Sequence, residues 1–216
     1  MAVIVLHGGP GAQGSADALA RGLASRGLDV IAPAQRRSGD VPLTVARHIE
    51  DLRALVGGGE ALVGASWGAM LALAFAAAHT ELAGPIALVG CGTFDRVARA
   101  RFQANLDAGM RYDVDADPPD RTPFDQRGND ETWSDMLRLQ DAGVYPAAFA
   151  AITSPVMMLH GADDPHPGAM IRDGLARWIP RLEYREFARC GHEPWRERGA
   201  RDEFFAALVD YLERCS

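Results

Sequence analysis

Short apolar runs alternate along this chain with longer stretches in which alanine, leucine and charged residues recur at helical spacing. The apolar runs are rich in Val, Ile and Leu, which is typical of strands buried on both faces. They predict strands at residues 2–7, 28–32, 60–65, 85–90, 155–160 and 182–187. The intervening stretches predict helices at residues 15–26, 43–56, 67–79, 168–178 and 199–213. This alternation indicates an α/β fold, in which helices cover both faces of a parallel sheet.

The segment from residue 92 to residue 150 interrupts the alternation. Its middle is a polar tract in which Pro118, Pro119 and Pro123 preclude a continuous helix, whereas both flanks have helical patterns. Because the segment lies between two predicted strands, we interpret it as an inserted lid of two or three short helices within one domain spanning residues 1–216. A disordered insertion is the alternative.

Composition and charge narrow the possible partners. The 216 residues are 48% hydrophobic and 24% charged, as in an ordinary globular protein. The net charge is -7 and the basic residues are spread along the chain, which disfavours nucleic acid and anionic membranes as partners. The three cysteines show no CxxC spacing, so neither a disulfide framework nor a zinc site is indicated. No apolar run approaches a membrane span, and the first residues lack the charged start of a secretory signal, so we expect a cytoplasmic protein.

Residues 64–68 read GASWG and match the G-x-S-x-G pattern, which presents a nucleophilic serine on a sharp turn between a strand and a helix. A predicted strand runs into this motif and a predicted helix leaves it, so Ser66 is the candidate nucleophile. Glycines are needed on both sides because a side chain there would collide with the neighbouring strand or helix. A serine that only caps the following helix is the alternative.

Residues 7–11 read HGGPG and form a glycine-rich turn directly after the first predicted strand. Acyl transfer builds negative charge on a carbonyl oxygen, and each preorganised N–H donor stabilises that charge by about 3–4 kcal/mol. We expect the N–H groups of Gly9 and Trp67 to form this oxyanion hole, while Pro10 shapes the turn. A phosphate-binding loop is the alternative. Residues 9–14 read GPGAQG and match G-x-G-x-x-G, a weak signal by itself, whereas the G-x-x-x-x-G-K-[ST] pattern is absent from the sequence.

An acid and a base are available further along the chain. Asp163 and Asp164 follow a buried predicted strand at its carboxyl end, where parallel sheets gather functional groups. His192 lies in a glycine-flanked loop after the last predicted strand, so the order is serine, aspartate, histidine, as in the α/β-hydrolases. A solvated loop histidine is the alternative at residue 192. Asp163, Asp164 and His166 could also form a metal pocket, although no second ligand cluster supports a metal. Local roles at strand ends or on helices are expected for the remaining histidines, His7, His48, His79 and His160.

With these elements placed, the chain resembles the α/β-hydrolase superfamily, and its HGGPG and GASWGAMLAL segments are most similar to the proline iminopeptidase branch. The resemblance covers nearly the whole chain apart from residues 92–150. It implies an α/β-hydrolase fold with about six parallel strands, without the antiparallel strands that usually precede the HG turn. In the G-x-x-D turn of the family, counted from Gly161, the catalytic carboxylate is Asp164, with Asp163 as the alternative, and the GH dipeptide of the family corresponds to Gly191 and His192.

The resemblance implies a serine hydrolase that needs neither cofactor nor metal and acts on a small-molecule ester or amide through an acyl-enzyme. We expect an esterase; an aminopeptidase or amidase of the iminopeptidase type is the alternative within the same mechanism. Iminopeptidases hold the free amino group of the substrate with acidic residues of a large cap, and here the candidates, for each of which a solvated polar face is expected, are Asp125, Asp130, Glu131 and Asp135. A non-catalytic binding module on the same scaffold is the alternative from another class, and the oligomeric state stays open.

Overall fold

The protein, described here from a computed structural model, is built on one six-stranded sheet. The structure describes residues 1–119 and 123–216; residues 120–122 of the predicted polar tract lie outside the described residues. The strands are β1 (Ala2–Leu6), β2 (Asp29–Ile31), β3 (Ala61–Ala65), β4 (Ile86–Val89), β5 (Val156–Gly161) and β6 (Leu182–Phe187). Their order is β2-β1-β3-β4-β5-β6 and every pairing is parallel, so the predicted α/β-hydrolase fold is confirmed.

The described helices are α1 (Asp17–Ala24), α2 (Val45–Arg53), α3 (Trp67–Ala78), α4 (Arg96–Asp107), α5 (Gln126–Asp141), α6 (Gly168–Ala176), α7 (Arg201–Arg214) and a 3₁₀ helix η1 (Ala147–Ala151). Each predicted helix is present, with ends that differ by a few residues. One helix start is set by a cap that periodicity does not reveal: the hydroxyl of Thr44 accepts a hydrogen bond from Arg47 N, and α2 begins at Val45. None of the described helices is long and apolar enough to cross a membrane.

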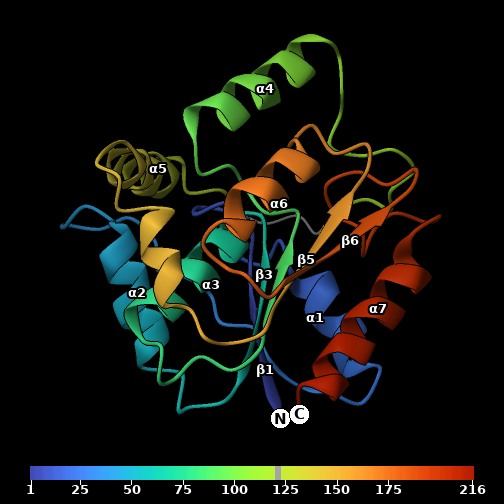
Figure 1. Cartoon of the computed structure of the whole chain (residues 1–216), viewed down its shortest axis with the longest axis horizontal. Coiled ribbons are helices and arrows are strands. Elements are labelled where there is room, and N and C mark those ends of the chain that lie inside the picture. Colours follow the sequence, from blue (N-terminus) through green and yellow to red (C-terminus); the bar gives the residue numbers. More distant parts are fainter. Residues whose placement is uncertain (120–122) are drawn as a thin grey trace.

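Helices cover both faces of the sheet (Figure 1), and each face carries its own hydrophobic layer. Because successive strand residues point to opposite faces, Val3 and Val5 of β1 pack with α1 and α7, whereas Ile4 and Leu6 pack with α2 and α3. The central helix α3 is buried on all sides from Trp67 to Ala76, which explains its uniformly apolar sequence. It holds the residue before it, Ser66, at the carboxyl end of β3.

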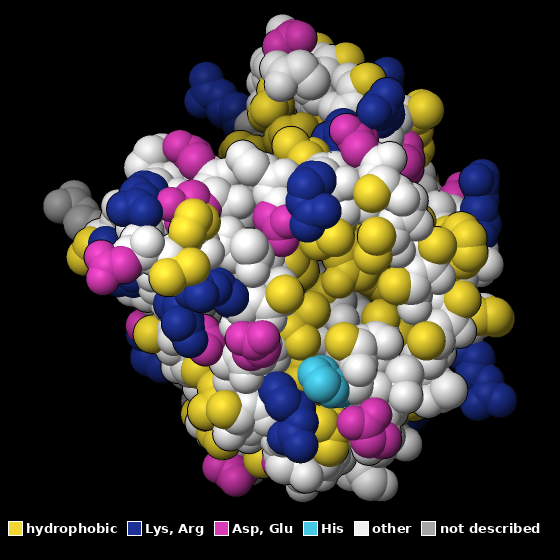
Figure 2. Space-filling model, turned by 90° about the vertical axis from the view of Figure 1, so that its left-hand side faces the viewer, with side chains coloured by type: hydrophobic (Ala, Val, Ile, Leu, Met, Phe, Trp, Pro, Cys, Tyr) yellow, Lys and Arg dark blue, Asp and Glu magenta, His cyan; other side chains and the backbone are white. Residues whose placement is uncertain are grey.

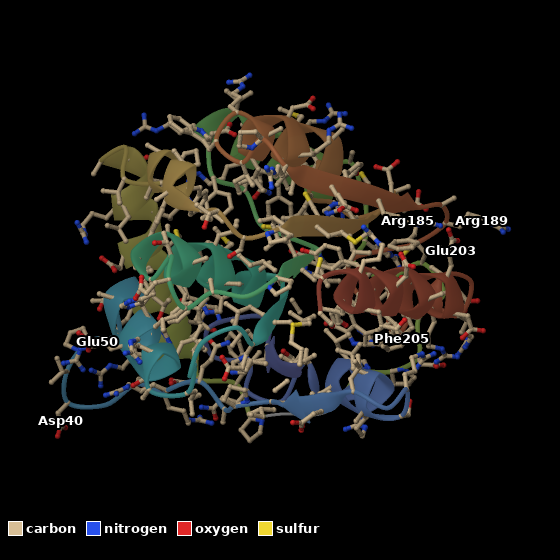
Figure 3. All side chains as sticks on the ribbon, turned by 60° about the horizontal axis from the view of Figure 1, so that its bottom comes forward. Asp40, Glu50, Arg185, Arg189, Glu203 and Phe205 are labelled. Atoms are coloured by element: carbon tan, nitrogen blue, oxygen red, sulfur yellow. The ribbon has the colours of Figure 1, made fainter. Side chains whose placement is uncertain are left out.

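Helices α1 and α7 approach closely on one face of the sheet because one of them carries a glycine at the contact. A Cβ on Gly22 would lie 2.1 Å from Phe205, whose ring faces α1 in Figure 3. The same view shows Arg185 of β6 beside Glu203 of α7, an exposed ion pair with an N–O distance of 2.5 Å. The last helix is therefore held both by apolar packing and by a surface ion pair.

The segment between β4 and β5 carries α4, α5 and η1, and Figure 1 places α4 and α5 above the carboxyl ends of the strands. The expectation that the acidic residues of this segment form a solvated polar face is wrong for three of them. Asp125, Glu131 and Asp135 accept hydrogen bonds from backbone N–H groups of residues 38–45 at 2.6 to 2.9 Å. These carboxylates accept the bonds because the backbone N–H groups of a loop and of the start of α2 have no partner within their own element. The order of charges along the sequence does not reveal such unpaired N–H groups. Asp130 is exposed, as expected.

Candidate active site

Ser66 occupies the turn between β3 and α3 in a strained backbone conformation, with φ 52° and ψ -114°. The flanking glycines are required by close backbone contacts. A Cβ on Gly64 would lie 2.2 Å from the carbonyl oxygen of Gly68, and a Cβ on Gly68 would lie 2.2 Å from that of Leu6. The turn is held further by Ser66 N, which donates to the carbonyl of Val89 at 2.8 Å. Local sequence thus places a partly exposed hydroxyl at the carboxyl edge of the sheet.

The glycine-rich turn after β1 lies directly against Ser66. A Cβ on Gly8 would lie 3.1 Å from the Cβ of Ser66, and Gly9, with φ 57°, lines the same pocket as Ser66 and Trp67. Trp67 is the first residue of α3, where helical N–H groups have no partner within the helix. The N–H groups of Gly9 and Trp67 make no hydrogen bond to any described residue, so both are available to an anion.

Asp164 and His192 form a buried pair, with 2.6 Å between Asp164 Oδ2 and His192 Nδ1. A carboxylate can only accept, so Nδ1 of His192 carries the proton and Nε2 carries the lone pair needed by a base. Asp163, the alternative carboxylate, has an exposed side chain and contacts the loop of His192 only through its backbone N–H, which donates to Cys190 O. Of the two aspartates, Asp164 is the one beside His192.

Burial and charge act in opposite directions on this pair. Burial disfavours the charged imidazolium, but the charge of Asp164 and its hydrogen bond outweigh that effect and raise the pKa of His192 above its ordinary value. For Asp164, burial favours the neutral acid, but the charge of His192 and the hydrogen bonds from His166 and His192 keep the pKa of the carboxyl well below its ordinary value. The pair is therefore an ionised carboxylate with an imidazole whose basicity is enhanced.

Ser66 and His192 each contact one of two consecutive residues at the end of β4, Val89 and Gly90. Val89 accepts the hydrogen bond from Ser66 N, and a Cβ on Gly90 would lie 3.0 Å from Nδ1 and Cε1 of His192. Among the described residues, the structure shows no hydrogen bond between Ser66 Oγ and His192. In a ligand-free arrangement such bonds are often long and tighten only when substrate is bound.

A second imidazole on Asp164, that of His166, was not predicted from the sequence. The backbone N and the Nδ1 of His166 each lie 2.9 Å from Asp164 Oδ1, and the His166 ring stacks on that of His192 with 4.8 Å between centroids. A usable signal was present in the sequence, because a polar residue two positions after an aspartate and between two prolines favours an Asx turn onto that aspartate.

Asp164, His166 and His192 also form a group with metal-ligand chemistry, since one ligand atom from each lies within 4.8 Å of the others. In the structure, both imidazole Nδ1 atoms are hydrogen-bonded to the carboxylate instead. Both oxygens of Asp164 are thus engaged by N–H donors, as expected of the carboxylate in an acid–base pair.

The loop that carries His192 is held by part of the inserted segment, which the sequence analysis also missed. His192 N donates to Tyr112 O at 2.6 Å, and Ala116 pairs with Glu197 in an antiparallel bridge. The fully buried carboxylate of Glu197 accepts from the backbone N–H groups of Val114, Asp115 and Gly191 at 2.8 to 3.1 Å. A buried glutamate without a basic partner is rare, and no local pattern predicts one.

Gln35 is a further buried polar residue behind the site. Its side-chain oxygen accepts from the indole N–H of Trp67 at 2.9 Å, and its backbone N–H donates to His7 Nε2 at 3.2 Å. His7 therefore donates from Nδ1 to Gly8 O, a local bond at a strand end as predicted. His160 likewise bonds locally, to His166 O.

The two remaining histidines lie on or beside helices. His48 lies on α2, where burial lowers its pKa to about 4. His79 was predicted at the end of a helix; it follows α3 as the capping residue because α3 ends at Ala78. Neither contacts Asp164 or His192 in the described structure; the ring of His48 instead lies 3.0 Å from the hydroxyl of Thr132 in α5.

A pocket of about 440 Å³ opens over Ser66. It is lined by Gly9, Ser66, Trp67, Gly92, Thr93, Arg99, Phe102, Tyr112, Trp133, Leu137 and His166. Four of these side chains are large and apolar or aromatic and come from the inserted segment, which therefore forms most of the wall facing the serine. Arg99 is the one permanently charged residue among these lining residues.

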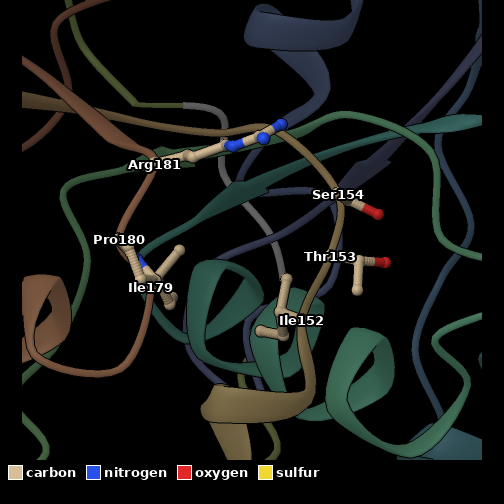
Figure 4. Close-up of a pocket in the computed structure, with 6 residues that line it drawn as sticks. All are labelled: Ile152, Thr153, Ser154, Ile179, Pro180 and Arg181. Carbon is tan, nitrogen blue, oxygen red and sulfur yellow. The ribbon is translucent and has the colours of Figure 1, made fainter.

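A second pocket, of about 310 Å³, lies at the opposite edge of the sheet (Figure 4). Its lining residues lie at 152–154 and 179–181, directly before β5 and β6, and therefore at the amino ends of the strands. Arg181 is its one ionisable lining residue. It offers no nucleophile beside a base, so the pocket over Ser66 is the candidate active site.

A parallel sheet with a strained serine turn after its third strand and an Asp–His pair after its fifth and sixth strands defines an α/β-hydrolase scaffold. The sequence profile of the alpha/beta hydrolase family matches residues 3–207, and the chain belongs to this family. The predicted superfamily is thereby confirmed, while the proline iminopeptidase branch stays a prediction.

Solved structures with the same fold span several chemistries. The chain is similar to a monoacylglycerol lipase from Paleococcus ferrophilus, with TM-score 0.72, 17% identity, and coverage of 99% of this chain and 94% of that one. It is also similar to 2-hydroxy-6-oxo-6-phenylhexa-2,4-dienoate hydrolase from Rhodococcus sp. strain RHA1, with TM-score 0.71, 21% identity, and coverage of 98% and 90%. Comparison with curated protein sequences gives no significant match. At these identities the likeness shows the fold alone, so the reaction must be argued from the site.

Proposed function

We propose that this protein is a serine hydrolase that cleaves carboxylic esters by a two-step acyl-enzyme mechanism. The observation that carries the proposal is the 2.6 Å hydrogen bond between Asp164 and His192, at the same sheet edge as a serine held in a strained turn. Strain of this kind is retained where a site needs a side chain in a particular place. A helix-capping serine has no need of it.

In the proposed first step, His192 Nε2 takes the Ser66 proton while Oγ attacks the ester carbonyl. The N–H groups of Gly9 and Trp67 hold the oxyanion, and Asp164 fixes the tautomer of His192 and stabilises its charged form. His192 then protonates the leaving alcohol. Water releases the acyl group by the same steps in reverse, and no step requires a cofactor or a metal.

The charge of the pocket lining favours an ester substrate rather than an aminopeptidase substrate with a free amino group. A free amino group is held by carboxylates, but none of the residues that line the pocket is acidic, and Arg99 would repel an ammonium group. Three of the four acidic candidates of the inserted segment are already bound to backbone N–H groups of residues 38–45. We therefore place ester hydrolysis ahead of amide hydrolysis.

We further propose that residues 92–150 act as a lid that sets specificity, since they supply most of the pocket wall over Ser66. A cytoplasmic location is proposed as well, because the three cysteines are unpaired. On the face shown in Figure 2, basic and acidic side chains are interspersed, with no field of one sign that would attract nucleic acid. A small-molecule substrate is the partner that this surface and pocket support.

The proposal is tested by replacing the nucleophile. Ser66→Ala should abolish hydrolysis of short-chain nitrophenyl esters and labelling by a fluorophosphonate probe, without loss of the fold. The matched control is Ser154→Ala in the pocket at the opposite edge, where the hydroxyl only donates to Ala83 O, and this variant should keep its activity. Activity of Ser66→Ala within tenfold of wild type would refute the proposal, and faster turnover of proline arylamides than of esters would favour the peptidase.

A further inference from the structure

His166 has a hydrogen-bonding capacity that the proposed catalytic steps do not use. Its Nδ1 lies 2.9 Å from a carboxylate oxygen that can only accept, so Nδ1 carries a proton. Burial lowers the pKa of His166 below its ordinary value, although the bond to Asp164 opposes this effect, so the ring is neutral near pH 7. In a neutral imidazole with Nδ1 protonated, Nε2 is an acceptor that cannot donate.

This acceptor is open to the pocket over Ser66. His166 lines that pocket, and its Nε2 has no hydrogen-bond partner among the described residues. Among the described residues, the buried side-chain atoms without a hydrogen-bond partner are His48 Nδ1, His160 Nδ1 and Trp195 Nε1. His166 Nε2 is not one of them, so this unpaired nitrogen is accessible to solvent. The other polar groups on the lining side chains are hydroxyls, which can donate or accept, and the Arg99 guanidinium and the two tryptophan indole N–H groups, which only donate.

The ring of His166 is held in place on both sides. It stacks on Phe102 of α4 at 4.2 Å and 15°, and on His192 at 4.8 Å and 26°. Helix α4 is fixed beside it by Asn105, whose amide donates to the carbonyl of Pro165 at 2.8 Å. The acceptor therefore has a set direction, as expected of a group that recognises a ligand.

The stacking also determines which part of the substrate would meet this acceptor. Both imidazoles are bound to Asp164 through Nδ1, and the ring of His166 stacks on that of His192 with 4.8 Å between centroids. His192 Nε2 is the atom that, under the proposed function, gives a proton to the leaving alcohol. His166 is therefore the pocket residue stacked on the group that meets the leaving alcohol.

We propose that His166 is a specificity residue that accepts a hydrogen bond from a second hydroxyl on the leaving alcohol, so that the preferred substrates are monoesters of small diols or polyols. The inference rests on the proposed ester hydrolysis and names its substrate class. The bond-making steps are unchanged, and His166 gains and loses no proton in them. Its contribution is binding energy next to the oxygen that His192 protonates.

The test compares two esters that differ only in that hydroxyl, ethyl butyrate and 2-hydroxyethyl butyrate. A net hydrogen bond is worth about 0.5–1.5 kcal/mol, so wild-type kcat/KM should favour the hydroxyethyl ester by roughly two- to tenfold. His166→Phe keeps an aromatic ring on Phe102 but has no ring nitrogen. It should lower the rates for both esters, because Asp164 loses a donor, and should bring their ratio to about one.

The ratio separates recognition of the substrate from positioning of Asp164. If His166 only positioned the carboxylate, His166→Phe would slow both esters by the same factor and leave the ratio intact, which would overturn the inference. Tyr112→Phe, which removes a hydroxyl from the same pocket, is the matched control and should preserve the wild-type ratio. If His166→Phe does not fold, His166→Asn takes its place, since its shorter amide can still donate to Asp164 but withdraws the acceptor from the pocket.

The outcomes also separate this inference from the proposed function. If wild type hydrolyses both esters at equal rates, the inference fails and the esterase stands. If wild type hydrolyses neither and Ser66 is not labelled by fluorophosphonate, the proposed function fails and the inference fails with it. A preference for the hydroxyethyl ester that disappears in His166→Phe and persists in Tyr112→Phe supports both.

Discussion

The two edges of the sheet are built from the same parallel strands but differ in what they hold. At the carboxyl edge lie a serine with φ 52°, a buried ionised carboxylate and two stacked imidazoles. At the amino edge, the lining of a pocket includes the apolar side chains of Ile152 and Ile179. The hydroxyl of its serine, Ser154, donates a hydrogen bond to Ala83 O. Strain and buried charge are thus concentrated at one edge, where the chain turns from strand to helix.

This contrast shows which contacts the fold must maintain for chemistry and which only stabilise it. Buried charge costs stability unless it is fully hydrogen-bonded, so residues that hold Asp164 and His192 should be sensitive to substitution. Residues at the surface of the amino edge or on the outer helices should tolerate it. The following predictions test that difference, from the largest expected effect to the smallest.

The largest effect is expected at the carboxylate. Asp164→Asn keeps the shape but removes the charge that orients and stabilises protonated His192, and should lower kcat by about 10³–10⁴. Asp163→Asn, one residue earlier and exposed, should change kcat by less than about threefold. Steady-state kinetics on one nitrophenyl ester measures both, and the reverse ranking would transfer the role to Asp163.

Glu197 should carry a large share of the stability of the His192 loop. Glu197→Ala leaves three backbone N–H groups without their acceptor. Because the bond from Gly191 is buried and those from Val114 and Asp115 are part-buried, the free energy of unfolding should fall by roughly 1–3 kcal/mol. Glu197→Gln keeps the shape and one acceptor oxygen and should lose less. Urea unfolding measures both variants; a loss below about 0.5 kcal/mol for the alanine variant would show that water replaces the carboxylate.

The pH dependence tests the electrostatics of the pair. In the proposed mechanism the neutral form of His192 is the base. Because Asp164 raises the pKa of His192, kcat/KM should fall tenfold per pH unit below an apparent pKa that lies above the ordinary value of about 6.5. Asp164→Asn should move the residual acid limb to lower pH, because the charge that favours the imidazolium is gone. A wild-type limb below the ordinary value would mean that burial outweighs the carboxylate.

The smallest effect is expected at the surface. Arg185 and Glu203 form an ion pair whose side chains are about half exposed, so Glu203→Ala should change the free energy of unfolding by no more than about 0.5 kcal/mol and leave kcat unchanged. It is also the matched surface control for Glu197→Ala. A loss comparable to that of Glu197→Ala would erase the distinction between the two regions.

The strands and covering helices could be predicted because their periodicity is a local property of the chain. The turn at Ser66 was predictable as well, since Gly64 and Gly68 are dictated by backbone contacts within and beside one short motif. His166 and Glu197 could not be assigned in the same way. The hydrogen-bond partners of these two residues lie in loops whose conformation depends on how the inserted segment packs against the sheet. No local sequence pattern specifies that packing.

The amino-acid sequence by itself determined the parallel sheet, the order of its elements, and a serine, an aspartate and a histidine at turns that follow strands. It did so because periodicity, glycine spacing and turn chemistry act over a few residues. Only the tertiary structure decided that Asp164 rather than Asp163 is hydrogen-bonded to His192, and that His166 binds the same carboxylate. It also decided that residues 112–117 contact the loop that carries His192. Those choices depend on side chains far apart in the chain meeting in a desolvated space, where a shift of an ångström decides which hydrogen bonds form.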